Sequence, residues 1–258
     1  MIDIHNHLLP NLDDGAQNFE ESVQLAQKLV EEGVTHAIVT PHHMNGRYVN
    51  PAANINERTI QFQEYLEQAQ VPLQVFPGQE VRIHSHLVET IREGDIQFLD
   101  ENNRYLLLEF PTAEVPAYTE DLVYDLKLLG ITPIIAHPER NHAIQKDPDI
   151  LLDLINQGCL SQITAASLAG VFGSDIQTQS LEMLDHHLAH LVASDMHDLD
   201  FRRAYLKEAF SFLEEEMGQE RMIQIQNCAE CIVKGKKVET PLPETIRKKK
   251  KRRWFGLF

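Results

Sequence analysis

Histidines and carboxylates recur in this sequence in patterns that suit a metal site, beginning with D-I-H-N-H at residues 3–7. His5 and His7 alternate with apolar, β-branched residues, which is typical of a short strand. Because strand side chains repeat every two residues, both imidazoles project from one face and can bind the same ion. Pro10 and the D-D-G turn at residues 13–15 return a carboxylate toward that place. Taken alone, a His-x-His pair is more often an ordinary pair of surface histidines.

The wider fold is predicted from segments whose apolar patterns alternate between strand and helix. Seven strands are expected at residues 2–7, 35–40, 73–77, 105–110, 131–136, 159–164 and 189–194. Helices are expected at residues 19–32, 52–68, 83–94, 119–129, 149–157, 176–187, 201–216 and 220–233. This alternation predicts an α/β fold of parallel β/α units, and seven units suggest a barrel one unit short of the usual eight.

Metal-type side chains stand at or just after the ends of these predicted strands. The nine candidate ligands are His5, His7, Asp14, His42, Glu80, Glu109, His137, Asp195 and His197. In a β/α barrel the carboxyl ends of all strands converge on one face, where active sites form. A purely structural role gives no reason for such side chains to recur at six strand ends, so the sequence predicts one shared metal site.

Nine ligands exceed the needs of one ion, since zinc takes about four and manganese or iron up to about six. A bridging carboxylate such as Glu80 would let two or three ions share the set. Imidazole and carboxylate without thiolate suit Mn²⁺, Fe or Zn²⁺. Two ions about 4 Å apart can activate water and polarise a phosphoryl oxygen. Arg140 and Arg202 follow two of the ligands closely and can bind phosphoryl oxygens, which favours phosphate-ester hydrolysis over amide hydrolysis.

Composition limits the alternatives. The 258 residues, 43% of them hydrophobic, suit one large globular domain. The N-terminus does not resemble a signal peptide, and no apolar run approaches the length of a membrane span. Three cysteines make a disulfide framework unlikely, so the expected compartment is the cytoplasm.

Two mechanisms with a protein nucleophile are not supported by the sequence. Each cysteine lacks an arginine six residues later, which argues against a Cys-x5-Arg phosphatase, and no G-x-S-x-G segment supports a serine nucleophile.

The C-terminal end differs from the rest of the chain. We expect one domain at residues 1–238 and a tail at residues 239–258, which is first Pro-containing and then basic and aromatic. Without the seven positive charges that begin at Arg247, the net charge of −16 becomes −23, and such an acidic body argues against nucleic-acid binding. The segment that ends at Phe258 could be a disordered solubilising end, contact an anionic membrane or bind an acidic protein.

Together, D-I-H-N-H, L-D-D-G, T-P-H-H, P-G-Q-E, A-H-P-E-R and S-D-M-H resemble the PHP (polymerase and histidinol phosphatase) superfamily. The closer resemblance is to the manganese-dependent protein-tyrosine phosphatases of Gram-positive capsule and exopolysaccharide systems. It implies a distorted PHP-type (β/α)7 barrel similar to a TIM barrel, and a trinuclear manganese site. It also implies phosphoryl-binding roles for Arg140 and Arg202, and the choice of Asp14 rather than Asp13 as ligand rests on it.

The resemblance further implies a phosphotyrosyl protein substrate, expected to be a membrane-associated bacterial tyrosine kinase that controls capsule or exopolysaccharide synthesis. The protein would then be cytoplasmic, with peripheral contact at the inner face of the membrane through residues 247–258. Three alternatives stay open: a small-molecule PHP phosphatase such as histidinol phosphatase, a PHP nuclease, and a metal-bound scaffold without catalysis. A phenolate leaving group, whose parent phenol has a pKa of about 10, needs little protonation, so His43 is only a weak candidate for a general acid.

Overall fold

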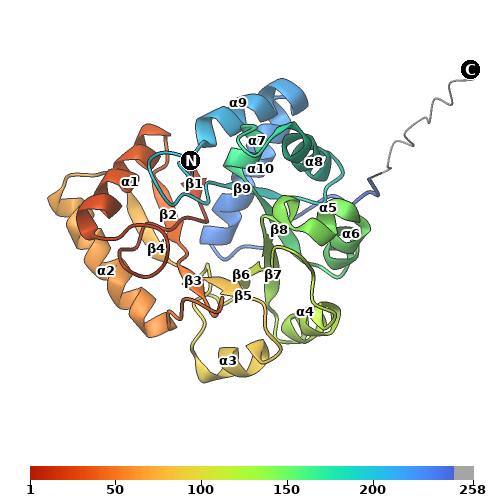
Figure 1. The fold of residues 1–258 in the computed structure, drawn as a ribbon, viewed down its shortest axis with the longest axis horizontal. Coiled ribbons are helices and arrows are strands. Elements are labelled where there is room, and N and C mark those ends of the chain that lie inside the picture. The colour runs from red at the N-terminus through yellow and green to blue at the C-terminus, as the bar shows by residue number, and fades with distance from the viewer. Residues whose placement is uncertain (247–258) are drawn as a thin grey trace, which may run out of the picture.

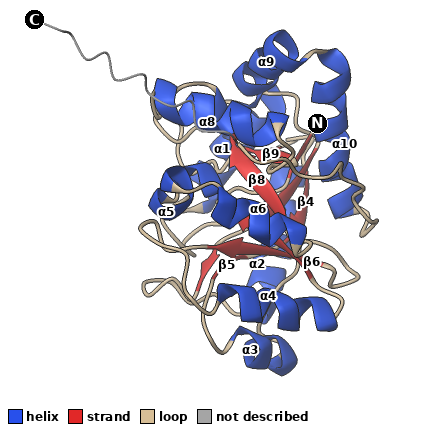
Figure 2. Cartoon of the chain, turned by 90° about the vertical axis from the view of Figure 1, so that its right-hand side faces the viewer, coloured by secondary structure: helices blue, strands red, loops and turns tan. Residues whose placement is uncertain are grey.

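The computed structural model describes residues 1–246, with short strands at the centre and helices around them (Figures 1 and 2). The strands are β1 Ile2–Asp3, β2 His36–Val39, β3 His42–His43, β4 Gln74–Pro77, β5 Glu80–Arg82, β6 Tyr105–Glu109, β7 Thr132–Ala136, β8 Leu160–Thr164 and β9 Leu191–Ala193. The helices are α1 Phe19–Glu31, α2 Ala52–Gln68, α3 Leu87–Glu93, α4 Thr119–Leu128, α5 His142–Lys146, α6 Asp149–Asn156, α7 Ala165–Leu168, α8 Ser174–Asp185, α9 Leu206–Met217 and α10 Gln219–Val233, and the 3₁₀ turn η1 is Pro138–Arg140.

The strands occupy seven positions, because β3 continues the path of β2 and β5 continues that of β4. All pairings between the named strands are parallel, in the orders β1-β2-β4 and β3-β5-β6-β7-β8-β9. Across the breaks, Gly78 N–H donates to Val39 O (2.9 Å) and Glu80 N–H donates to Pro41 O (3.2 Å). Gly78 is required here, since a Cβ would lie 2.5 Å from Ile38 Cγ2.

The sheet closes between its first and last strand positions. Asn6 and Met196 form a parallel bridge. On either side of it, Asp195 N–H donates to His5 O (2.8 Å) and His7 N–H donates to Met196 O (2.9 Å). The predicted distorted barrel of seven β/α units is therefore confirmed, and its closing seam runs through residues of the candidate site.

Side chains alternate along β6 between the outside and the inside of the barrel, and this places a carboxylate inside at the carboxyl end of the strand. Along β6, Leu106 and Leu108 pack in the larger core between the strands and the helices. Tyr105 and Leu107 belong instead to the smaller core inside the barrel. Glu109 has the same phase as these inward residues, so it points into the barrel mouth. The inward-facing residues of β6 are thus apolar or aromatic along the strand and become acidic where the strand ends.

The opposite end of the barrel is sealed. Tyr105 at the start of β6 donates its hydroxyl hydrogen to Lys236 O (2.6 Å) and accepts a hydrogen bond from Val238 N–H (3.1 Å). Ala229 and Ile232 of α10 pack into the inner core beneath it. With this end closed by α10 and residues 236–238, the carboxyl ends of the strands form the accessible mouth.

One predicted helix begins later than expected, with a consequence for the site. The spacing predicted a helix over residues 201–216, but α9 begins at Leu206. Asp198 Oδ1 accepts hydrogen bonds from the backbone N–H groups of Asp200 (2.8 Å) and Arg202 (3.0 Å). This side-chain turn competes with helix formation, so Arg202 lies on a loop.

Other boundaries differ in detail. The helix predicted at residues 83–94 covers only Leu87–Glu93, and the short elements α5, α7, β3 and β5 were not predicted. Short segments form one turn or a few pairings each, so their periodicity is too brief to identify.

The described residues contain no helix long and apolar enough to span a bilayer. Within residues 239–246, Glu244 N–H donates to His186 O (2.8 Å) and Ile246 packs against the main core. The boundary between a domain at residues 1–238 and a tail at residues 239–258 stays a prediction. The basic and aromatic segment from Arg247 lies outside the described residues.

Candidate metal centre

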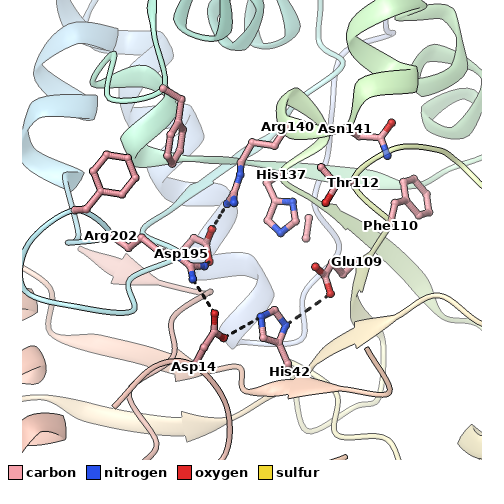
Figure 3. Close-up of a pocket in the computed structure, with 13 residues that line it drawn as sticks. Asp14, His42, Glu109, Phe110, Thr112, His137, Arg140, Asn141, Asp195 and Arg202 are labelled. Atoms are coloured by element: carbon pink, nitrogen blue, oxygen red, sulfur yellow. Dashed lines mark hydrogen bonds and ion pairs between the residues drawn. The ribbon is translucent and has the colours of Figure 1, made fainter. Parts of the chain in front are cut away.

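All nine predicted ligands lie together at the carboxyl ends of the strands, beside a cavity of about 360 Å³. Figure 3 shows the five of them that line this cavity, namely Asp14, His42, Glu109, His137 and Asp195. Three overlapping groups have ligand atoms within 4.8 Å of one another: His7, Asp14, His42 and His197; His5, His7 and Glu80; and His42, Glu80 and Glu109. The shared members join these groups into one cluster large enough for more than one ion. His137 and Asp195 are joined to it by the contacts described below.

Glu80, at the start of β5, is the centre of this cluster. It is fully buried, and its Oε2 lies 2.8 Å from His42 Nδ1 and 3.3 Å from His5 Nε2. Its Oε1 accepts a hydrogen bond from His137 Nε2 (2.8 Å). Burial by itself would raise the pKa of Glu80, but the His42 and His5 imidazoles hold it well below its ordinary value. The two oxygens therefore face different histidines, as expected for a bridging carboxylate.

Asp195 follows β9 and lies on the other side of the same histidines. Its Oδ1 is 3.6 Å from His5 Nε2 and 3.5 Å from His7 Nε2. Burial would raise the pKa of Asp195, yet the neighbouring imidazoles, led by His5, keep it well below its ordinary value. Glu109 behaves differently: burial and the nearby Glu80 carboxylate raise its pKa. Such crowding of carboxylates is costly without a cation between them.

The two adjacent aspartates of the D-D-G turn have different positions. Asp14 Oδ1 lies 3.5 Å from His42 Nε2 and 3.6 Å from His197 Nε2, within the cluster. Asp13 lies outside it and accepts a hydrogen bond from His7 Nδ1 (2.6 Å). Backbone N–H groups of His42 (3.0 Å) and Gly15 (2.9 Å) also donate to Asp13. Asp14 is thus placed to bind an ion and Asp13 to orient His7.

Three histidines use Nδ1 for a supporting hydrogen bond and turn Nε2 toward the cluster. His7 bonds to Asp13, His5 Nδ1 to Gln162 Oε1 (2.8 Å), and His197 Nδ1 to Asp195 O (2.9 Å). Donation from Nδ1 leaves Nε2 unprotonated, which is the tautomer that ligates metals. Gln162 and the supporting role of Asp13 were not predicted. Gln162 left no clear signal in the sequence, because Ser161 and Thr164 of the same strand β8 are polar as well.

We expect Asp13→Asn to weaken metal binding by about 10- to 100-fold while the protein still folds. Asparagine keeps the shape but removes the charge that holds His7 in the tautomer described above. The measurement is metal affinity by competition with a fluorescent chelator. Asp121→Asn, an exposed position on α4, is the matched control. Unchanged affinity in the Asp13 variant would show that it does not support His7.

The donor set fits divalent transition-metal ions. Within the described residues, four buried atoms of the cluster have no partner in hydrogen-bond geometry, namely His42 Nδ1, His197 Nε2, Glu80 Oε2 and Glu109 Oε2, although His42 Nδ1 and Glu80 Oε2 lie 2.8 Å apart. Leaving such atoms unsatisfied is expensive, and ligation by a cation would satisfy them all. Imidazole nitrogens and carboxylate oxygens without a thiolate suit manganese, iron or zinc.

The backbone before Arg140 has an uncommon conformation, which directs the Arg140 side chain into the cavity. It ends η1, which begins after His137 in the left-handed region (φ 34°). Glu139 is fully buried and anchors this turn, because its Oε1 accepts hydrogen bonds from Thr164 N–H (3.0 Å) and the Ser167 hydroxyl (2.7 Å). The A-H-P-E-R sequence thereby sends its glutamate inward and its arginine into the cavity.

The two arginines converge on one carboxylate. Arg140 Nη1 donates to Asp195 Oδ2 (2.5 Å), and Arg202 Nη2 lies 3.6 Å from Asp195 Oδ1. Arg202 Nη1 also donates to Asp14 Oδ2 (3.0 Å). Figure 3 shows both side chains at the cavity beside Asp195 and Asp14. Two guanidinium groups this close together have the donors to bind an anion with several oxygens.

The cavity also has an aromatic part that was not predicted. Phe110, Phe172 and Phe201 line it together with both arginines. Phe110 directly follows β6, whereas the other two lie on separate loops, so no local pattern in the sequence indicated that they meet.

His43 and the cysteines of α10 lie outside the cluster. His43 is buried away from the cavity, where its Nδ1 accepts a hydrogen bond from Asn50 N–H (3.2 Å) and its Nε2 lies 3.9 Å from Asp95. The geometry therefore does not support His43 as a general acid. Cys228 and Cys231 lie on α10, and no cysteine belongs to a candidate metal group in the described part of the chain.

Residues 1–233 match the family model described as capsular polysaccharide synthesis, CpsB/CapC. The chain belongs to the CpsB/CapC family. It is 40% identical over 258 residues to tyrosine-protein phosphatase YwqE of Bacillus subtilis, covering 100% of both chains. It is 30% identical over 230 residues to tyrosine-protein phosphatase CpsB of Streptococcus agalactiae, covering 87% of this chain and 94% of CpsB. The resemblance seen in the sequence motifs is thus confirmed.

Solved structures agree with this CpsB/CapC assignment. One is described as YwqE from Bacillus subtilis and CpsB from Streptococcus pneumoniae, unique metal-dependent tyrosine phosphatases. It superposes with a TM-score of 0.93 at 39% identity and covers 96% of this chain and 100% of that one. The phosphotriesterase homology protein from Escherichia coli has a TM-score of 0.59 at 12% identity, covering 89% of this chain and 97% of that one, which shows a shared barrel fold only.

Proposed function

We propose that this protein is a metal-dependent protein-tyrosine phosphatase that hydrolyses phosphotyrosine on a protein substrate. The observation that carries the proposal is the meeting of Arg140 and Arg202 on Asp195, beside a cluster of nine metal-type groups that includes His137 and Asp195 through their contacts with it. Such a site combines cations for a phosphoryl group with ligands for several ions. The curated relatives YwqE and CpsB are named tyrosine-protein phosphatases, which supports the same assignment.

The proposed metal ligands are His5, His7, Asp14, His42, Glu80, Glu109, His137, Asp195 and His197. We assign them two or three Mn²⁺ ions, with iron and zinc as the other ions that this donor set suits. When bound, such ions polarise the phosphoryl group and make water a better nucleophile at neutral pH. Mixed donors of this kind do not select manganese by themselves, so the bound metal is measured by elemental analysis of protein purified without added metal.

The chain's own residues would act on the phosphoryl group as follows. Arg140 and Arg202 bind its non-bridging oxygens, and Asp195 holds both guanidinium groups in place before substrate arrives. Buried Asp13 and Gln162 keep His7 and His5 oriented. The leaving tyrosine phenolate has a parent pKa of about 10 and can depart without a dedicated general acid. This agrees with the position of His43 outside the cavity.

The test compares three substrates in Mn²⁺: a phosphotyrosyl peptide, histidinol phosphate and a nucleotide phosphodiester, each with an EDTA control. We expect preferential hydrolysis of the peptide, lost in EDTA and restored by Mn²⁺. Preference for histidinol phosphate or for the diester would replace the proposal with a small-molecule phosphatase or a nuclease. Metal binding without hydrolysis of any of the three would indicate a scaffold.

We further propose that the substrate is a membrane-associated bacterial tyrosine kinase of capsule or exopolysaccharide synthesis. The protein would act in the cytoplasm, close to the inner face of the membrane. The sequence of residues 247–258 supports this location, because seven basic residues precede Trp254 and Phe255, a composition that attracts anionic lipid. Co-sedimentation with phosphatidylglycerol vesicles should fall when these residues are removed, and equal pelleting would reject membrane contact.

A further inference from the structure

We propose that Phe172 and Phe201 form an aromatic wall that binds the tyrosine ring of the substrate and selects aryl over alkyl phosphate esters. The inference rests on the proposed phosphatase function and adds a specificity determinant to it. It concerns two side chains that line the cavity but have no part in the metal cluster.

The two rings form one surface. Phe172 lies between α7 and α8, and Phe201 lies on the loop after β9. Their centroids are 6.0 Å apart with an interplanar angle of 68°, an edge-to-face arrangement. An edge-to-face pair of this kind leaves ring surface available for a third aromatic group. Because both residues line the cavity that holds Arg140 and Arg202, this surface borders the phosphoryl site.

Phe201 contributes little to the core of the protein despite its size. It is 60% exposed, whereas Phe110 on the same cavity is 4% exposed. A large apolar side chain in water contributes little to folding, and an exposed ring beside polar groups is typical of a contact surface. Its loop is also held in place, since His197 N–H donates to Arg202 O (2.9 Å). Phe201 is therefore presented at a defined position.

Arg140 links the aromatic wall to the phosphoryl site. Its guanidinium carbon lies 5.1 Å from the centroid of the Phe172 ring, while its Nη1 donates to Asp195. A phosphoryl group bound by Arg140 would hold its ester substituent close to the same ring. In an aryl ester the ring is attached directly to the ester oxygen and can reach the wall. An alkyl ester of serine or threonine offers no aromatic face there.

The direct test measures binding of non-hydrolysable probes to Mn²⁺-loaded protein by calorimetry. The probes are phenylphosphonate, methylphosphonate and inorganic phosphate. We expect the unmodified protein to bind phenylphosphonate about tenfold more tightly than methylphosphonate, and Phe201→Ala to reduce this ratio to about twofold. Phe172→Leu should reduce it as well. Phe201→Tyr should restore the preference, because it keeps the ring.

Two controls make the outcome specific. Leu199→Ala removes a 39% exposed apolar side chain from the same loop that does not line the cavity, so its phenyl preference should stay at the unmodified value. Affinity for inorganic phosphate should be unchanged in Phe201→Ala, which shows that the cluster and the arginines are intact. A phenyl preference that survives in both phenylalanine variants would overturn the proposal.

Kinetics then separate this inference from the proposed function. For phosphotyrosyl and phosphoseryl peptides of one sequence, Phe201→Ala should lower kcat/KM for the phosphotyrosyl peptide by about tenfold and leave the slower phosphoseryl reaction within about twofold. Equal losses on both peptides would reject an aryl-specific role. If the unmodified protein hydrolysed no phosphotyrosyl peptide, the proposed function would fail, whereas the calorimetric preference would still decide whether the wall binds aryl groups.

Discussion

Replacing Glu80 with glutamine is expected to lower turnover on a phosphotyrosyl peptide by on the order of a thousandfold or more and to reduce the bound metal. Glutamine has the same shape as glutamate but no charge. Its amide NH₂ group would also place hydrogen-bond donors against the histidines on one side of the cluster, where Glu80 offers an acceptor oxygen. Glu80 Oε2 faces His42 Nδ1 at 2.8 Å and its Oε1 faces His137 Nε2 at 2.8 Å, so the change affects both sides of the cluster. Metal content by elemental analysis and turnover in Mn²⁺ are the measurements.

Glu114→Gln is the matched control for Glu80→Gln, because Glu114 is an exposed glutamate outside the cluster. It should keep the metal stoichiometry and turnover of the unmodified protein. Chelation provides a second comparison. If Glu80 bridges ions, EDTA-treated protein and Glu80→Gln should melt at similar, lowered temperatures. A Glu80→Gln variant with full metal content and turnover within tenfold of the original would reject the bridging role.

Arg140→Ala is expected to lower kcat/KM on the same peptide by about 10²- to 10³-fold while metal content stays unchanged. The guanidinium reaches the cavity but stays protonated and has no lone pair to offer a metal ion, so its loss removes phosphoryl binding and not a ligand. Arg140→Lys should recover only part of the activity, since an ammonium cannot bind two oxygens in the planar arrangement of a guanidinium. Steady-state kinetics, phosphate inhibition and elemental analysis are the measurements.

The control for Arg140 is Arg92→Ala, which removes an exposed arginine on α3. Phosphate should inhibit that control as it inhibits the unmodified protein and should inhibit Arg140→Ala more weakly. Turnover at the original level in Arg140→Ala would exclude Arg140 from phosphoryl binding. Loss of metal together with turnover would show instead that Arg140 acts by holding Asp195, its 2.5 Å partner.

The fold was largely predictable because barrel strands and their helices carry strong local patterns. The helix at residues 52–68 was predicted with the observed bounds of α2. The error at α9 has a local cause that the apolar spacing did not include, namely the side-chain turn that Asp198 makes with Arg202 N–H. The breaks between β2 and β3 and between β4 and β5 were missed because each piece is only two to four residues long.

For the candidate site, the sequence by itself determined which residues would meet. Parallel strands in a barrel all end on one face, so ligand-type residues at the strand ends converge there regardless of the conformation of the connecting loops. This reasoning brought His5, Glu80 and His137 together although 132 residues separate the first from the last. Their function as ligands stays a proposal, but their proximity followed from topology alone.

Only the tertiary structure decided how these residues are oriented and what surrounds them. The turn of Asp13 toward His7, the sharing of Asp195 by two arginines, and the contact between Phe172 and Phe201 depend on loop conformations and barrel curvature. These contacts join residues from different loops. The spacing of residues within one segment gives no information about the distance between two loops. Sequence therefore determined the composition of the centre, and packing determined its geometry and its aromatic wall.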